Sequence, residues 1–489
     1  MKKKLLPTFE WLSLIVFLGL FFSLFWRGEE ELRPLTASAL EASITQERWN
    51  GIFFADQHVG YSVARSSQLD DGRRLMEQRS VFRVSTFGKS QQIITAGAAL
   101  SSSAGFLEQF DFFMVSGDIK ISARGAISGK QIVMEINQAG EKTKMTFDVQ
   151  NPPHVSLSLE SALRQQEFAI GKSFSIPYFD PITLNQQDMT FRVTDSEILE
   201  NGEEAWWLQS SFGGMVTRTL IDANGAMLRQ EGGAMGLSVV RMSPEEAQDI
   251  PKGAEDVDLI ALSAVPLKGR LKEPRSKKSL VVEVSGVDAQ KISHQPPLQV
   301  ITDNRVSIQI PDISLLDDEI IAAPKDSDFL EETLTIPVSH KEIKAKAKKI
   351  TQGSQNRKEA VDRINTFVFD YIAKEPVIGV PNGLQALRSA KGDCNEHTAL
   401  FVSLARAAHI PTRIAAGLVY SDRAGPRKSF YYHAWAEVLL QDTWVPIDPT
   451  FGQFPADATH IKVVEGDLDK QISIMGLLGN ISLKLIDAQ

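Results

Sequence analysis

Between Trp49 and about Arg241 the chain shows the hydrophobic pattern of β-strands. Stretches such as GIFFADQHVGYSVA, SVFRVSTF and QIVMEINQ alternate apolar and polar residues or run apolar over a few positions, with Gly, Asn and Asp between them. Asn201-Gly202 and Asn224-Gly225 each stand between two such runs, and these dipeptides favour the positive φ angles of type I′ hairpin turns. The pattern predicts a mostly antiparallel β domain, to which we assign residues 31–250.

The pattern becomes less regular after this domain. A helix is predicted to start at Ser243, because Ser-Pro-Glu-Glu offers an N-cap, a proline in the first helical position and acids in the first turn. Residues 251–278 have the composition of an exposed connector, and SLVVEV, PLQVIT and RVSIQI then predict three strands. We expect a linker and a small β module over residues 251–325.

Helical spacing dominates from about Asp326. Residues 339–350 and 357–372 carry apolar side chains at a period of 3.6, and another helix is predicted near Cys394. Strands return in TRIAAGLVY, FYYHAWAEVLL and TWVPIDPTF. Helices followed by a sheet indicate an α+β domain over residues 326–489. The fold class expected for the chain is therefore α+β, with antiparallel β domains before the helical region.

Residues 11–26 form an uncharged apolar run that follows three consecutive lysines. At ~1.5 Å per residue the run spans ~24 Å, somewhat less than the ~30 Å core of a bilayer and more than a signal-peptide core of about 7–15 residues requires. Tryptophans at both ends match the interfacial belt of a spanning helix. We expect residues 1–30 to form a cytoplasmic tip and a single-pass transmembrane helix in the inner (cytoplasmic) membrane, with the rest periplasmic or extracytoplasmic. A removed signal peptide, cut near Ala37-Ser38-Ala39, is the alternative.

Composition narrows the possible functions. The formal net charge of -9 argues against a nucleic-acid partner, because phosphate backbones are bound by clustered Lys and Arg. Cys394 is the only cysteine in 489 residues, so it cannot form an intrachain disulfide. In an oxidising compartment such a thiol is either an intermolecular bridge or a reactive group. A buried packing residue is the other interpretation, since free cysteine is among the most buried residue types.

The segment KGDCNEHTALFVSLARAAHIPTR places this cysteine at the start of a helix. Asp393 is suited to cap the helix and Glu396 to complete a capping box, and Pro411 ends the helix after about Ala408. As the first helical residue, Cys394 meets the unsatisfied amides and the positive end of the helix dipole, which favour a thiolate. A backbone amide at the same end can bind an oxyanion. The position predicts a nucleophile with a lowered pKa.

A thiol nucleophile needs a base, and the base needs an orienting group. His433 lies in FYYHAWAEVLL, and the strand TWVPIDPTF follows after a turn centred on residues 441–442. With that turn, Asp448 is the diagonal neighbour of His433 on the same face, roughly 7–8 Å away at Cα. A slip of one residue would move Asp448 to the other face. The sequence thus predicts Cys394, His433 and Asp448 as catalytic residues.

Three segments resemble the catalytic blocks of the transglutaminase-like superfamily, which has a papain-like fold. They are GDCNEHTALFVSLARAAHIPTR, YHAWAEV and WVPIDPTFGQFPADATHI. The resemblance covers about residues 326–467 and implies Cys394 as nucleophile, His433 as general base and acid, and Asp448 as the residue that orients His433. It departs from the family at Ala408-His409, where a glycine is usual. The N-terminal region also resembles, more loosely, the envelope domain of bacterial members, through WNGIFFADQHVGYS.

The resemblance implies that a thiolate attacks a carboxamide or peptide carbonyl and forms an acyl-enzyme. Water as the second nucleophile gives a cysteine peptidase or amidase, which we expect, and an amine gives a cross-linking acyltransferase. A catalytically silent binding or scaffold protein of the cell envelope is the alternative from another class. The expected partner is a peptide or protein substrate, or a component of the cell envelope.

Neither a metal nor a cofactor is expected. His397 follows Cys394 by three residues and is a candidate for an alternative base, or for a zinc ligand together with Cys394 and His433. Zinc sites usually take three or four protein ligands, but the sequence has no second cysteine and no close pair of histidines. No loop of EF-hand type indicates calcium.

Overall fold

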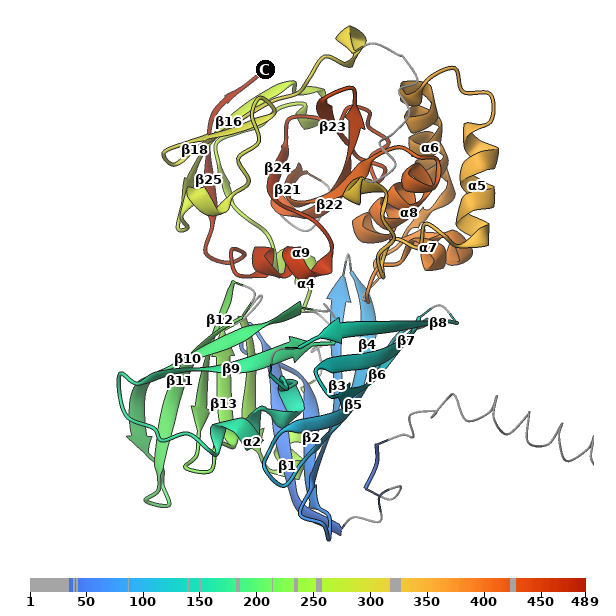
Figure 1. The fold of residues 1–489 in the computed structure, drawn as a ribbon. Coiled ribbons are helices and arrows are strands. Elements are labelled where there is room, and N and C mark those ends of the chain that lie inside the picture. The colour runs from blue at the N-terminus through green and yellow to red at the C-terminus, as the bar shows by residue number, and fades with distance from the viewer. Residues whose placement is uncertain are drawn as a thin grey trace, which may run out of the picture.

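The computed structural model describes residues 35–489, apart from residues 38–39, 41–42, 87, 139, 150, 182–184, 213, 233–235, 252–256, 317–326, 378 and 423–427. Of the described residues, 49% lie in strands and 20% in helices. The expected α+β class is therefore wrong, and the protein is mostly β (Figure 1). The reason is that strands fill three separate sheets, whereas the long helices are confined to residues 341–407.

The transmembrane helix expected within residues 1–30 lies outside the described residues. Within the part of the chain that the structure describes, no helix is both long and apolar enough to cross a bilayer. The structure thus gives no support to this part of the predicted fold.

A single antiparallel sheet of fourteen strands contains the N-terminal part of the chain (Figure 1). Its order is β8-β7-β6-β5-β4-β3-β2-β1-β14-β13-β12-β11-β10-β9, so only the pairing of β1 with β14 joins strands distant in sequence. The strands are β1 (Ser43–Phe54), β2 (Gln57–Gln68), β3 (Arg74–Thr86), β4 (Lys89–Ser101), β5 (Leu107–Ser116), β6 (Ile119–Ser128), β7 (Gln131–Gln138), β8 (Glu141–Asp148), β9 (Ser173–Asp180), β10 (Asn185–Ile198), β11 (Glu204–Phe212), β12 (Met215–Ile221), β13 (Met227–Gly232) and β14 (Leu237–Met242).

The two Asn-Gly dipeptides lie in turns between strands of this sheet, but the turns are not of type I′. Gly202 and Gly225 have positive φ, whereas the asparagines before them do not. A type I′ turn requires positive φ at both central residues. A single glycine in the left-handed region is typical of the longer hairpin loops built on a type I turn.

Two further sheets and a strand pair occupy the C-terminal half. The four-stranded sheet has the order β23-β22-β21-β24, and the five-stranded sheet has the order β15-β25-β16-β18-β17, which includes the last strand of the chain. These strands are β15 (Leu267–Lys268), β16 (Ser279–Ser285), β17 (Gln299–Thr302), β18 (Arg305–Gln309), β21 (Thr412–Ser421), β22 (Ser429–Leu440), β23 (Thr443–Ile447), β24 (His460–Glu465) and β25 (Ser482–Ala488), with β19 (Ala373–Lys374) and β20 (Lys391–Gly392) as the pair.

Helix α8 is the centre of the helical half. Its residues from Glu396 to Arg406 are buried, because apolar side chains occur on every face of the helix. It contacts α5, α6 and α7 and the strands β21 and β22. The helices are α2 (Leu159–Leu163), α3 (Pro244–Gln248), α4 (Leu259–Leu262), α5 (Lys341–Thr351), α6 (Arg357–Tyr371), α7 (Gly383–Ser389), α8 (Cys394–Ala407) and α9 (Leu468–Met475), with the 3-10 turns η2 (Ser156–Ser158), η5 (Pro274–Ser276), η6 (Ala289–Lys291), η7 (Ile313–Leu315) and η8 (Asp328–Leu330).

Polar contacts join the large sheet to the segment that leads into α8. Gln91 donates from Nε2 to the carbonyl of Pro376 at 2.9 Å, and Gln138 donates to the carbonyl of Val380 at 2.6 Å. Arg388 of α7 pairs with Glu141 of β8 at 2.9 Å. The large sheet is thus positioned close to the start of α8.

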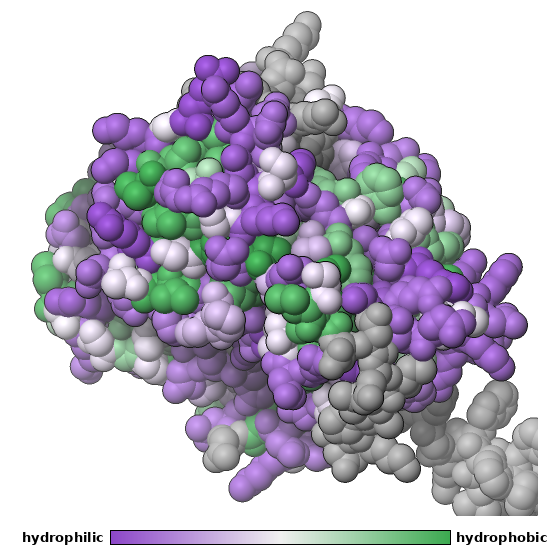
Figure 2. Space-filling view, turned by 90° about the horizontal axis from the view of Figure 1, so that it is seen from above, coloured by the Kyte–Doolittle hydropathy of each residue, from purple (hydrophilic) through white to green (hydrophobic). Residues whose placement is uncertain are grey.

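Seen from above, the surface of the molecule shows hydrophobic residues only in small groups between hydrophilic ones (Figure 2).

The close approach of α7 to α8 yields a first prediction. A Cβ atom at Gly383 would lie 2.1 Å from Oγ of Ser403 and 2.9 Å from the carbonyl oxygen of Ala399. We expect Gly383→Ala to destabilise the protein by ~1–3 kcal/mol, the usual cost of overpacking. Thermal unfolding of the full chain measures this, with the exposed Ser389→Ala on the same helix as control. Equal unfolding temperatures for both variants would contradict it.

Candidate active site

Cys394 is the first residue of α8, as the sequence predicts. The Asp393 side chain accepts a hydrogen bond from the Asn395 amide at 2.9 Å, and the Asp393 amide donates to Oε2 of Glu396 at 3.0 Å. These bonds form the expected capping box, which fixes the start of the helix. Cys394 forms no disulfide, and the residue as a whole is partly exposed.

Two contacts hold this helix end against the strand that carries His433. Thr398, one turn into α8, donates from Oγ1 to the carbonyl of Ala434 at 3.0 Å. The backbone of Ala434 also forms a hydrogen bond with the Cys394 thiol. Because Ala434 directly follows His433 in β22, these contacts bring the thiol next to the His433 position.

The hairpin of β22 and β23 brings His433 and Asp448 together. Leu440 pairs with Thr443, and Ala436 pairs with Ile447, which is the register that the sequence predicts for a two-residue turn. His433 Nε2 lies 2.9 Å from Oδ2 of Asp448, and both side chains are buried. The ring of His433 stacks on Phe451, with ring centroids 5.0 Å apart. Since Nε2 faces the carboxylate, Nδ1 is the ring nitrogen left for the thiol.

Asp448 is fully buried and accepts four hydrogen bonds. Oδ1 receives the amides of Thr450 and Phe451 at 2.7 and 3.1 Å, and Oδ2 receives His433 and His460 at 2.9 and 3.0 Å. Burial alone would raise the pKa of Asp448, but the neighbouring charge and hydrogen bonds of the two histidines outweigh it and hold the pKa well below its usual range. The carboxylate is therefore ionised at any physiological pH.

His460 belongs to the same hydrogen-bonded network, and the sequence analysis missed it. It begins β24, is buried, and places Nδ1 2.9 Å from the carbonyl oxygen of Asp457. Burial opposes its charge, but hydrogen bonds with Asp448 and Asp457 outweigh this and raise the pKa of His460 to about 9. Arg275 in turn pairs with Asp457 at 3.0 Å. The sequence did contain a signal for His460, because this histidine begins an apolar strand and lies within the block WVPIDPTFGQFPADATHI.

The thiol of Cys394 does not have the lowered pKa that its helix position predicts. Burial raises the pKa of Cys394 well above its ordinary value, and the carboxyl of Asp393 adds to the effect. Burial also raises the pKa of both carboxyl groups. The pKa of Glu396 is raised most strongly, because the charge of Asp393 adds to the effect of burial, whereas hydrogen bonds, including one with Glu396, partly offset burial at Asp393. The capping box thus supplies acids whose proximity opposes a resting thiolate.

His397 forms a hydrogen bond with the backbone at the start of α8. Its Nδ1 lies 2.6 Å from the carbonyl oxygen of Asp393, which makes this nitrogen the donor. Burial lowers the pKa of His397 to about 4, so the ring is neutral at physiological pH. Its Nε2 is buried without a partner among the described residues. This ring therefore supports the first turn of α8 through the backbone.

Residues 344–449 match the family model of the transglutaminase-like superfamily. This part of the chain belongs to that superfamily. The match includes Cys394, His433 and Asp448, and it lies within residues 326–467, for which the resemblance was inferred. No curated protein matches the chain.

Three solved structures are similar to parts of the chain. A "putative cysteine protease" from Cytophaga hutchinsonii is 13% identical, with a TM-score of 0.30 over 46% of this chain and 85% of that one. The ethylmercury-bound periplasmic domain of TgpA from Pseudomonas aeruginosa is 16% identical, with a TM-score of 0.22 over 37% and 92%. A beta-barrel-like protein of a domain of unknown function from Brucella abortus is 9% identical, with a TM-score of 0.33 over 40% and 94%.

The residues best placed to ligate a metal share only His433 with the set suggested by the sequence. Among the described residues, ligand atoms of His433, Asp448 and His460 lie within 4.8 Å of one another. Each of these histidines uses its Nε2 in a hydrogen bond with Oδ2 of Asp448. A metal would have to replace both bonds, so the donor set fits an imidazole-carboxylate network better than a metal site. The absence of a metal stays a prediction.

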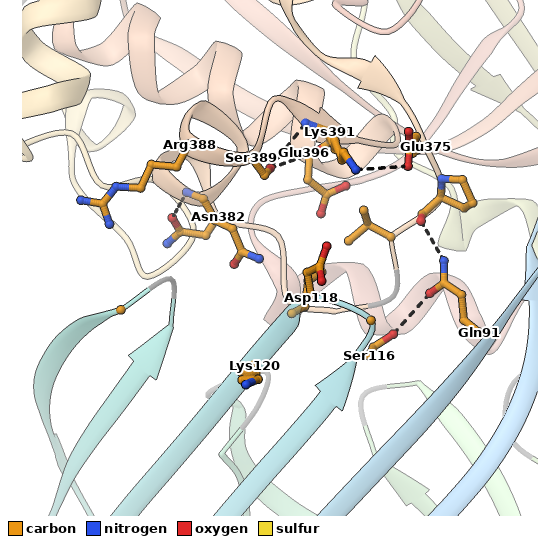
Figure 3. A pocket seen from close by; sticks show the side chains of 16 residues that line it. Gln91, Ser116, Asp118, Lys120, Glu375, Asn382, Arg388, Ser389, Lys391 and Glu396 are labelled. Atoms are coloured by element: carbon orange, nitrogen blue, oxygen red, sulfur yellow. Dashed lines mark hydrogen bonds and ion pairs between the residues drawn. The ribbon is translucent and has the colours of Figure 1, made fainter.

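A cavity of about 620 Å³ lies beside the start of α8 (Figure 3). The large sheet supplies one side, including Asp118 and Lys120, and the segment before α8 supplies another, including Arg388 and Lys391. Glu396 lines it from the helix itself. The volume lies within the ~300–1,000 Å³ of ligand sites. The large sheet thus contributes to a cavity of the transglutaminase-like domain.

The raised pKa of His460 predicts a specific pH dependence of stability. A histidine whose folded pKa is raised stabilises the fold fully below its unfolded pKa of ~6.5 and loses that contribution as pH rises through about 9. Between pH 6 and 10 the wild type should therefore lose ~2–3 kcal/mol more free energy of unfolding than His460→Gln. Urea unfolding measures it, with the exposed His409→Asn as control. Equal losses in wild type and His460→Gln would contradict the assignment.

Proposed function

We propose that the transglutaminase-like domain is a thiol enzyme that hydrolyses amide or peptide bonds through Cys394, His433 and Asp448. The observation that carries this proposal is the buried contact of His433 with Asp448, on the strand that also holds the thiol of Cys394 through Ala434. A nucleophile, a base and an orienting carboxylate in this order are the elements of covalent acyl transfer.

The proposed reaction has two stages. In the first, the Cys394 thiol gives its proton to Nδ1 of His433 while sulfur bonds to the substrate carbonyl carbon, and the amine leaves with the proton from His433. This forms a thioester with the enzyme. In the second, His433 takes a proton from water, the hydroxide oxygen bonds to the acyl carbon, and the C–S bond breaks to release a carboxylic acid. The proton returns to sulfur, and Asp448 stabilises the imidazolium in both stages.

The substrate is proposed to be a peptide or protein chain that extends from Cys394 into the neighbouring cavity, which Glu396 lines and Cys394 does not. Both signs of charge line it, with Asp118 and Glu375 opposed by Lys120 and Lys391. Mixed charge suits a polar chain with both donors and acceptors better than an apolar one. The inner-membrane location and the periplasmic or extracytoplasmic placement stay predictions, as does an envelope partner.

A second candidate function is a binding protein that keeps this fold without catalysis. The raised pKa of Cys394 favours it, since a relic thiol in a buried site should remain neutral and unreactive. The two functions differ in whether His433 activates the thiol. Both can be tested without knowing the natural substrate.

An activated ester provides the first test. With p-nitrophenyl acetate, the full chain should release one equivalent of p-nitrophenol in a rapid burst, because Cys394 is acetylated before water removes the acetyl group. Cys394→Ala should abolish the burst, and His433→Ala should slow it ~100-fold or more, the usual contribution of a general base. Arg229→Ala, on the exposed side of β13, is the control. Equal burst rates in the wild type and in His433→Ala would favour the binding protein.

The acceptor is tested by adding an amine. The acetyl-enzyme should break down at the same rate with and without cadaverine, and the product should be acetate, if water is the natural acceptor. Cadaverine that accelerates the breakdown and becomes acetylated would instead establish a cross-linking acyltransferase. Mass spectrometry of the products distinguishes the two outcomes, with Asp448→Asn as a variant that should slow both stages.

A further inference from the structure

The large sheet encloses a second cavity, away from Cys394. It has a volume of about 540 Å³ and lies between the inner face of the sheet and the helical segment η2–α2. In Figure 1, α2 lies against the inside of the curved sheet. Strands β1 to β4 and β9 to β14 all contribute residues to its lining. Protein interiors rarely leave voids much larger than a water molecule, so a cavity of this size is a ligand-sized feature.

Most of the cavity wall is apolar. Alternate residues of each strand face inward, so the inner face collects the apolar positions of many strands. Six of the side chains that line it are Ile52, Phe54, Phe82, Phe191, Leu208 and Ile221. Such a wall suits a flexible hydrocarbon chain, because burial of apolar surface needs no directional contacts.

One part of the wall carries a cluster of positive charge. Arg48 binds Glu160 of α2 through two hydrogen bonds, at 2.7 and 2.9 Å, and Arg164 reaches the same carboxylate at 3.0 Å. Arg241 also lines the cavity, close enough to Arg48 for the two charges to interact. Arg48 and Arg164 thus contact Glu160 directly, Arg241 interacts with it by charge, and the charges of Asp222 and Arg241 also interact. Asp180 is a further carboxylate in the lining of the cavity.

Arg241 is the arginine of this cluster that has a free hydrogen-bond donor for a ligand. It donates from one terminal nitrogen to the carbonyl of Met227, but its Nε is buried without a partner. Among the described residues, no carboxylate forms an ion pair with it. Asn50, which is opposite Arg241 in the pairing of β1 and β14, likewise has a buried Oδ1 without a partner. Unsatisfied buried groups are costly and rare in native proteins, so two on facing positions require an explanation.

We propose that this cavity binds a single-chain amphiphile, with its hydrocarbon tail along the apolar wall and its anionic head group at Arg241. A carboxylate or phosphate oxygen accepts the free N–H of Arg241 and pairs with its positive charge. A head group with a hydroxyl, or a water beside it, donates to Asn50. This site is separate from the proposed hydrolytic site and does not depend on that activity.

A fluorescent fatty acid tests the proposal on the full chain. cis-Parinaric acid should bind saturably in a 1:1 ratio, with increased fluorescence, and its methyl ester should bind about tenfold or more weakly, because the ester has no charge to pair with Arg241. The comparison of acid and ester uses the unaltered protein and needs no variant. Absence of saturable binding, or equal affinity for acid and ester, would overturn the proposal.

Matched variants assign the head group to Arg241. Arg241→Met should weaken the acid about tenfold and leave the ester unchanged, Arg241→Lys should retain most of the acid affinity, and Arg229→Met on the neighbouring strand should change neither. Palmitate and lysophosphatidate should displace the bound probe, and the stronger of the two identifies the head group as carboxylate or phosphate. Equal displacement by neutral monopalmitoylglycerol would contradict an anionic site.

Discussion

The buried carboxylate of Asp448 is the group on which the candidate active site depends. A charge removed from water costs several kcal/mol unless hydrogen bonds replace its hydration. Here two backbone amides and the imidazoles of His433 and His460 replace it. These donors come from β22, from the turn after β23 and from the start of β24. The sheet therefore has to be assembled in one register for the charge to be tolerated, and that register is also the one that positions His433.

Support for this carboxylate extends to a segment outside the region matched by the family model. Arg275 lies in η5, between β15 and β16 of the five-stranded sheet, and the Cζ of its guanidinium lies 4.5 Å from the ring centroid of Phe451. His433 stacks on the same ring, and Arg275 also binds Asp457, the residue that anchors His460. One arginine thus steadies both histidines that contact Asp448. These contacts of Arg275 are structural. They make the geometry of the candidate active site depend on η5, which lies outside the region matched by the family model.

The sequence predicted the parts of the site that local rules determine. The capping box follows from Asp393 and Glu396 three positions apart, and the diagonal placement of Asp448 follows from a two-residue turn. The role of His460 and the pairing of β25 with β16 depend on contacts between distant parts of the chain, which periodicity does not encode. The mostly β class was missed because the fourteen strands of the large sheet contain far more of the chain than the helices of the C-terminal region do, and the pattern alone does not show how long each strand runs. The pKa of Cys394 was misjudged because burial outweighs the helix dipole, and burial of a helix end has no local signature.

The direction of that pKa shift bears on how the domain would catalyse acyl transfer. A resting thiolate at Cys394 would be poorly solvated and close to the carboxyl groups of Asp393 and Glu396, so the site disfavours it. During attack, however, negative charge leaves sulfur for the substrate oxygen, and the proton arrives on His433, next to the carboxylate of Asp448. The electrostatics therefore oppose the separated thiolate but favour the state in which proton transfer and C–S bond formation have both occurred. Catalysis in such a site rests on transfer of the proton in step with attack, which makes the contact of His433 with Asp448 more important than the position of Cys394 on the helix dipole.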